Sequence, residues 1–220
     1  ATVFIKLAEG DPGVSEQNEI KYTEFRDIDN VEFNGGNVHN NYFNNSNCNP
    51  GGSTKGLMIK KGQDPLIFAN NQFSHWGLGL DVQDGNGTTQ ITGNTGDTAI
   101  FFRQSQNGTN TTIANNTITG SSSTNYFLLE INAGTITHTN NTYGGTSGIV
   151  QLGTNNNLTL SGLTVTGCYS LTAVTSMSAV LTIEDSTVSG CKYLMVSDGV
   201  GASDVVLQYN NLTFKEAVAV

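Results

Sequence analysis

Four charged side chains recur at intervals of 21 to 27 residues, each at the end of a short apolar stretch: Lys60, Asp81, Arg103 and Glu130. If such stretches stack, the four side chains form one short column. An arginine could then neutralise the carboxylate of a uronate while a lysine removes the neighbouring proton, which is lyase chemistry. We treat the four residues as catalytic candidates, with the alternative that they are ordinary charges at solvent-facing strand ends.

A second candidate site is the pair His75 and Trp76, in the stretch FSHWGLG. An exposed tryptophan beside a histidine could stack on a sugar ring, which makes both residues ligand-binding candidates. The alternative is that a tryptophan next to Gly77 caps the packed core at a chain corner. No His, Cys or carboxylate cluster has the spacing of metal ligands, and we expect neither a metal nor another cofactor.

The composition indicates which kind of fold positions these residues. Charged residues make up only 12% of the 220-residue chain, which contains 27 Asn, 26 Gly and three Pro. Strand-forming and turn-forming residues dominate, and no long amphipathic helical stretch stands out, so we expect an all-β fold. A net charge of −9 argues against nucleic acid as a partner, and the lack of an 18-residue apolar run argues against membrane insertion.

Asn-Asn pairs recur between short apolar stretches, as in TTIANNTITG at 111–120. Asparagine is a poor strand residue that tolerates positive φ, so each pair indicates a corner. Aligning the copies gives an anchor two residues before each pair and a second position five residues after the anchor. The anchors are Ile20, Val38, Phe68, Ile91, Ile113, His138, Leu160, Ile183 and Leu207. A period near 23 residues, lengthened once by a loop insertion at 44–56, indicates a solenoid whose coils must stack to bury their apolar faces.

The pattern xTIxNNTIxG…GIxL resembles the right-handed parallel β-helix repeats of the pectate-lyase-like superfamily, over roughly residues 18–214. The resemblance implies three parallel sheets per coil, about nine coils, and a corner ladder of stacked asparagine amides. We assign that ladder to Asn40, Asn70, Asn115 and Asn140, each followed by a second Asn. Asn94 continues the column, and Gly162, Asp185 and Tyr209 interrupt it. The catalytic motifs of the superfamily are missing, so the chain resembles a surface or adhesin-type member.

Threonines form further columns on this alignment. Four residues after successive anchors lie Thr95, Thr117, Thr142, Thr164 and Thr187. A flat, regular threonine array could bind ice. The alternative is that threonine is simply a favoured polar residue on the solvent face of a sheet.

Two cysteines occupy equivalent positions. Cys168 and Cys191 each lie eight residues after their anchors, so they should stack about 4.8 Å apart on adjacent coils. That separation permits a disulfide, and a reduced pair is an equally open alternative. Cys48, in the loop insertion, has no obvious partner.

Several asparagines satisfy the N-x-S/T glycosylation pattern, which an Asn- and Thr-rich repeat also produces by composition alone. We select Asn44, Asn86 and Asn107, which we place in loops, as candidate glycosylation sites. Asn115 and Asn140 also match the pattern, but we expect the corner ladder to bury them.

The sequence therefore predicts one parallel β-helix domain over 1–220, a segment of a longer chain because neither end carries a cap. We expect a non-enzymatic structural or adhesive rod, such as an adhesin stalk, fibre segment or virion spike section, located outside the cell or on a cell or virion surface. Its expected partners are other copies or neighbouring domains at the two ends, and possible carbohydrate. The alternatives are a polysaccharide-binding or polysaccharide-degrading β-helix, and an ice-binding protein.

Overall fold

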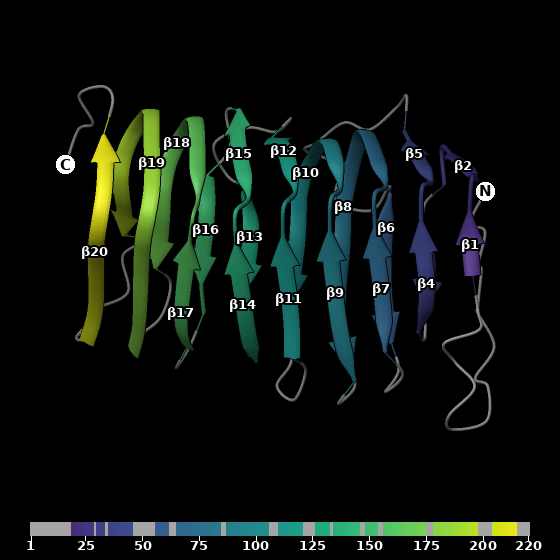
Figure 1. The fold of residues 1–220 in the computed structure, drawn as a ribbon, viewed down its shortest axis with the longest axis horizontal. Helices are drawn as coiled ribbons and strands as arrows, with labels where there is room; N and C mark the ends of the chain where they lie inside the picture. The colour runs from purple at the N-terminus through teal and green to yellow at the C-terminus, as the bar shows by residue number, and fades with distance from the viewer. Residues whose placement is uncertain are drawn as a thin grey trace.

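The structure, a computed structural model, describes residues 19–28, 30–33, 35–45, 56–61, 65–84, 87–105, 110–120, 126–132, 134–145, 148–153, 156–174, 178–197 and 204–214. Within these ranges there are 20 strands and no helix. Every strand is parallel to the strands it pairs with, and the strands follow one another along a single axis (Figure 1). The chain is a parallel β-solenoid, which confirms the predicted fold class.

Each turn of the solenoid contributes to three sheets, which we call A, B and C. Sheet A consists of β1 (Glu19–Lys21), β4 (Gly36–His39), β7 (Leu66–Ala69), β9 (Thr88–Thr92), β11 (Asn110–Ala114), β14 (Thr135–Thr139), β17 (Asn156–Ser161) and the first parts of β19 (Ser178–Ser197) and β20 (Asp204–Phe214).

Sheet B follows the Asn-Asn corner. It consists of β2 (Glu24–Arg26), β5 (Tyr42–Asn44), the first parts of β8 (Gln72–Asp84) and β10 (Thr95–Gln104), β12 (Thr117–Gly120), β15 (Thr142–Gly145), the first part of β18 (Thr164–Val174), and later parts of β19 and β20. Sheet C consists of β3 (Asn30–Phe33), β6 (Leu57–Lys61), the second parts of β8 and β10, β13 (Phe127–Ile131), β16 (Gly148–Leu152), and the ends of β18 and β19.

The register of sheet A pairs the predicted anchors in order from Ile20 to Ile183. The last anchor is different: Ile183 pairs with Tyr209, not with Leu207 as predicted. Ile183 and Tyr209 are 26 residues apart in the sequence, two more than the predicted spacing of 24. In the described residues no strand of sheet C follows β20.

At the corner between sheets A and B the backbone is left-handed in every coil. The corner residues are Tyr22, Asn40, Asn70, Gly93, Asn115, Asn140, Gly162, Asp185 and Asn211, with φ between 48° and 66°. Asparagine, aspartate and glycine reach this conformation at low cost, which explains the composition of the corner. Gly162 and Asp185 therefore continue the corner column instead of interrupting it, and Asn211 takes the position we predicted for Tyr209.

The buried amide ladder uses the second residue of each corner pair. Asn40, Asn70, Asn115 and Asn140 are exposed, so our assignment of the ladder to them is wrong. The ladder consists of Asn41, Asn71, Asn94, Asn116 and Asn141, all at most 2% exposed. The left-handed residue turns the backbone outward at its own position, and the next side chain then points inward.

The amides inside the ladder share one hydrogen-bond pattern, which Asn94 illustrates. Asn94 Nδ2 donates to Asn116 Oδ1 at 2.9 Å and to the Phe68 carbonyl at 3.0 Å. Asn94 Oδ1 accepts from the backbone N–H and the Nδ2 of Asn71, at 2.9 and 3.0 Å. The buried polar groups therefore carry hydrogen bonds from coil to coil instead of costing desolvation energy.

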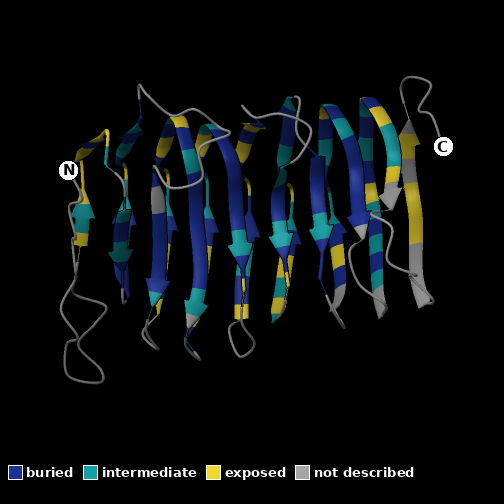
Figure 2. Ribbon diagram, turned by 180° about the vertical axis from the view of Figure 1, so that it is seen from behind, coloured by how far each residue is buried: buried dark blue, intermediate teal, exposed yellow. Residues whose placement is uncertain are grey.

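Between the three sheets lies an apolar core that runs along the axis. In the first coils it is a stack of aromatic rings, with Phe25 and Phe43 4.7 Å apart and Phe43 and Phe73 5.5 Å apart between ring centroids. In the later coils the core is mainly aliphatic, with Leu160, Ile183 and other side chains completely buried. Figure 2 shows the buried interior strands and the more exposed terminal strands β1 and β20.

Candidate functional site

Three of the four charged candidates meet on the outer face of sheet C. Arg103 in β10 pairs in register with Asp81 in β8 on one side and with Glu130 in β13 on the other. Their neighbours Leu80, Val82 and Phe102 point into the core, so the alternation of the strands turns the charged side chains outward. The predicted column therefore exists for these three residues.

The cluster is an arginine between two carboxylates. Arg103 Nε donates to Glu130 Oε2 at 2.7 Å, and Arg103 Nη1 lies 4.0 Å from Asp81 Oδ2. The side chains of Asp81 and Glu130 are 5% and 14% exposed, whereas that of Arg103 is 32% exposed. The charge of Arg103 is already compensated by its two partners, so it is poorly suited to neutralising an additional uronate.

Two further polar side chains complete the cluster, and our sequence reasoning missed them. Gln83 Nε2 donates to Asp81 Oδ2 at 2.8 Å, and Ser105 Oγ donates to Asp81 Oδ1 at 3.1 Å. Each lies two residues after a cluster member, Gln83 after Asp81 and Ser105 after Arg103, so it falls on the same strand face. This spacing of two residues could have identified both side chains from the sequence, because residues i and i+2 of a strand lie on the same face.

Lys60 does not belong to this cluster. The pairing of β6 with β8 shifts register, so that Ile59 lies opposite Asp81 and Lys60 lies opposite Val82. Lys60 therefore points into the solenoid, where it is completely buried. The predicted partnership of a lysine base with Arg103 is wrong, because an irregularity in the strand moved the lysine to the other face.

Trp76 and His75 do not form a joint binding surface. Trp76 is completely buried, where its Nε1–H donates to the Leu78 carbonyl at 3.0 Å and its ring packs 5.3 Å from that of Phe43. The prediction that Trp76 contacts a ligand is wrong, and the alternative of a core tryptophan holds. His75 is exposed in a left-handed conformation, and its backbone N–H donates to Asp97 Oδ2 at 2.9 Å.

A buried histidine lies at the end of the amide ladder. His138 occupies an anchor position and is 2% exposed. Its Nε2 lies 3.0 Å from Asn141 Nδ2 and 3.2 Å from the Tyr143 hydroxyl oxygen. The Asn141 amide nitrogen can only donate, so a neutral His138 ring can accept a hydrogen bond from it at Nε2. Burial lowers the pKa of His138 to about 4 and raises the pKa of Tyr143 well above its ordinary value.

The threonine column is continuous along sheet B. Thr95, Thr117, Thr142, Thr164 and Thr187 pair in register, and Thr213 extends the series as a sixth member. All six side chains are exposed or half-buried. A second file, two residues further on, is interrupted by Gly144 between Thr119 and Thr166.

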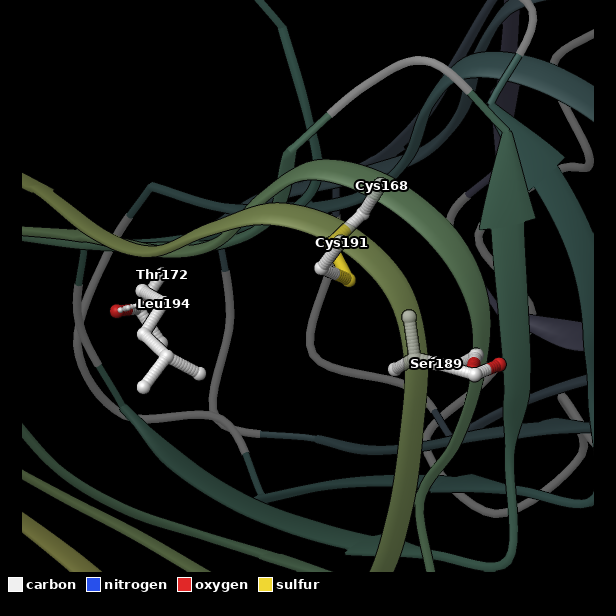
Figure 3. Close-up of a disulfide and its surroundings, with 6 residues drawn as sticks. Cys168, Thr172, Ser189, Cys191 and Leu194 are labelled. Carbon is white, nitrogen blue, oxygen red and sulfur yellow. Dashed lines mark hydrogen bonds between the residues drawn. A yellow bond between two sulfur atoms is a disulfide. The ribbon is translucent and has the colours of Figure 1, made fainter. Parts of the chain in front are cut away.

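Cys168 and Cys191 form a disulfide between β18 and β19, with their Cα atoms 4.3 Å apart (Figure 3). The structure thus selects one of the two alternatives left open by the sequence. Both cysteines are buried, at 6% and 3% exposed. A neighbouring hydrogen bond, from Thr172 Oγ1 to the Leu194 carbonyl at 2.9 Å, joins the same two coils. Cys48 lies outside the described residues.

The glycosylation candidates have different outcomes. Asn44 is half-buried in β5, whereas Asn86 and Asn107 lie outside the described residues. Asn115 and Asn140 are exposed, so our expectation that the ladder buries them is wrong for the reason given above.

No group of three or more His, Cys, Asp or Glu side chains in the described ranges could hold a metal ion. The same ranges contain no helix that is long and apolar enough to span a membrane. No protein-family model, no curated protein and no solved structure matches the chain.

Proposed function

We propose that this chain is a non-enzymatic structural rod of an extracellular or surface-exposed protein, built as a right-handed β-helix of the pectate-lyase-like kind. The observation that carries the proposal is the side-chain reinforcement between coils. Asparagine amides join consecutive coils from Asn41 to Asn141, and the Cys168–Cys191 disulfide joins two later coils.

The amide ladder and the disulfide connect consecutive coils along the axis of the solenoid, which is the direction in which a rod is loaded. Each coil is already hydrogen-bonded to the next through three sheets, and each ladder amide adds side-chain bonds worth about 1 kcal/mol apiece. Coils held in this way resist fraying into the open, protease-sensitive segments that a loop-rich protein offers. A stiff spacer that presents or separates other parts of a surface protein needs this property.

The disulfide supports an extracellular setting. Disulfides persist in oxidising compartments and are rare where glutathione keeps thiols reduced. The low charge of the chain and its coat of Asn, Thr and Ser are also consistent with a secreted surface.

The proposal is tested by pulling on the chain from its two ends in a single-molecule force experiment. A rod should lose its coils in small, regular steps at high force, and Asn94→Leu should lower the force of the steps around the ladder. A single cooperative rupture at low force would contradict the proposal. Asn70→Gly, at the exposed corner position beside the ladder, is the matched control and should leave the force unchanged.

A second candidate function, a carbohydrate site, is favoured by the cluster of Asp81, Arg103 and Glu130. The Arg103 side chain is 32% exposed, and its guanidinium group can hydrogen-bond sugar hydroxyls beside the less exposed carboxylates of Asp81 and Glu130, in the way that a few convergent polar groups do in binding sites. We would screen the purified chain for glycan binding and polysaccharide cleavage alongside Arg103→Ala. Binding or cleavage that the variant abolishes would favour this function over the inert rod, whereas an inactive wild-type chain would exclude it for the polymers screened.

A further inference from the structure

We infer that Asn115 and Asn140 are N-glycosylation sites, so that the corner between sheets A and B carries oligosaccharide. The inference rests on the proposed extracellular function, because the transfer takes place in the secretory pathway. It reverses the expectation that the corner is too buried, and it follows from which asparagine of each pair holds the ladder.

The two asparagines present their side chains to solvent. Both are exposed, with left-handed φ values of 57° and 53° that turn the chain away from the core. Their backbone N–H groups donate to the next coil, at 3.2 Å from Asn115 to Thr139 and 3.0 Å from Asn140 to Ser161. Neither side-chain amide nitrogen makes a hydrogen bond to the described part of the chain, so both are available for modification.

The middle residue of each sequon holds the corner in place through the ladder and leaves the first asparagine accessible. Asn116 and Asn141 are buried ladder members, and their amides bond the coils on either side. A sugar on the first asparagine therefore breaks no ladder bond. The same sugar on the second asparagine would destroy the ladder, but the second asparagine never starts a sequon in these pairs.

The third residue of the sequon comes from the threonine column. Thr117 and Thr142 follow the two corner pairs, whereas the pairs at 40–41 and 70–71 are followed by Tyr42 and Gln72. Sequons thus arise where the asparagine corner meets the threonine column of sheet B. Of the other coils, only the last repeats the combination, at Asn211 and Thr213.

The chemistry is an ordinary transfer. The amide nitrogen attacks the anomeric carbon of a lipid-linked oligosaccharide, a C–N bond forms, and the bond to the lipid pyrophosphate breaks. One amide proton is lost to a base of the transferase, and the product keeps one N–H. The sugar then projects from the corner, away from the packed core.

Spacing limits how many sugars the corner accepts. Asn115 and Asn140 occupy adjacent coils, about 4.8 Å apart along the axis, which is narrower than an oligosaccharide. We therefore expect one glycan on most chains at this pair and few chains with both. Asn211 lies three coils beyond Asn140, about 14 Å away, and its occupancy should be independent of the pair.

The experiment is expression in a eukaryotic secretory host, followed by peptide mapping after enzymatic release, which converts each glycosylated Asn to Asp. We expect conversion at Asn115 or Asn140 in more than half of the chains. Thr117→Ala should abolish conversion at Asn115 and raise it at Asn140. Gln72→Thr, which creates a sequon at Asn70 in the same left-handed conformation, should introduce a glycan at Asn70. Asn70→Gln creates no sequon, so this control should leave the glycan pattern of the wild-type chain unchanged.

The outcomes separate this inference from the proposed function. An absence of glycan from Asn115 and Asn140 in a secreted chain that carries its disulfide overturns the inference and leaves the rod intact. Glycan at these positions in a chain that the cell does not export supports the inference and contradicts the extracellular function. Conversion at the sequons of 44, 86 or 107 alone also overturns the inference.

Discussion

The coils up to about residue 145 and the coils after residue 155 share one backbone plan but are held together differently. In the earlier region, five asparagines form a continuous amide ladder at the inner side of the corner. In the later region Leu163 and Ser186 fill the same position, and the Leu163 N–H donates to Ser186 Oγ at 3.0 Å. The disulfide joins the coils in that region.

The cores differ in the same way. Aromatic rings stack through the first coils, whereas leucine, isoleucine and valine fill the later ones. Yet the corner residue keeps a left-handed φ in both regions, at Asn70 and Asn140 as well as at Gly162 and Asp185. The comparison teaches that the corner conformation defines the coil, while the reinforcement between coils is interchangeable.

The largest expected effect is the removal of a central ladder amide. Asn94→Leu deletes four hydrogen bonds, two accepted from Asn71 and one each donated to Phe68 and Asn116. The buried donors of Asn71 lose a partner, so we expect a loss of about 4 kcal/mol in the free energy of unfolding. Denaturant titration measures the loss, and hydrogen exchange locates it.

The control for this variant is Asn70→Gly at the exposed corner position. Glycine already occupies that position at Gly93 and Gly162 with the same sign of φ. We expect a change below about 0.5 kcal/mol. If Asn94→Leu were equally mild, the later region's apolar filling would suit the earlier region too, and the ladder would not be its main reinforcement.

Most of the fold, and less of the site, was predictable from the sequence. The anchors from Ile20 to Ile183 were predictable because each coil must place its apolar residues in one column, although the spacing between successive anchors varies from 18 to 30 residues. The assignment of the ladder failed because Asn115 and Asn116 are chemically identical, and only the backbone conformation decides which one points inward. Lys60 was misplaced because a local register shift leaves no mark in the composition of β6.

The second effect is confined to the later region. The Cys168–Cys191 disulfide closes a loop of 23 residues, and its removal should cost about 3 kcal/mol. A Cys168→Ser/Cys191→Ser variant should lose hydrogen-exchange protection in β18 and β19 while β9 and β11 stay protected. Equal loss of protection in both regions would mean that the solenoid unfolds as one unit. The earlier and later regions would then not differ in their free energy of unfolding.

The smallest effect lies at His138, where the ladder ends. Burial lowers the pKa of this histidine from 6.5 to about 4, so the unfolded chain binds the proton more tightly than the folded chain. The stabilisation is complete above pH 6.5 and is lost as the pH falls towards 4, with about 2 kcal/mol lost between pH 7 and pH 5. Protonation would also set an N–H of the ring against the Asn141 amide donor, 3.0 Å away.

A His138→Leu variant separates this effect from the titration of carboxylates. Leucine matches Leu160, the paired anchor in the next coil, so the variant should fold and should lose the histidine part of the pH dependence. Urea titrations at pH 5 and pH 7 should show a difference about 2 kcal/mol smaller than in the wild-type chain. An unchanged difference would mean that His138 is not the group that titrates. The end of the ladder would then be insensitive to acid, like the next coil, where the non-titratable Leu163 occupies the ladder position.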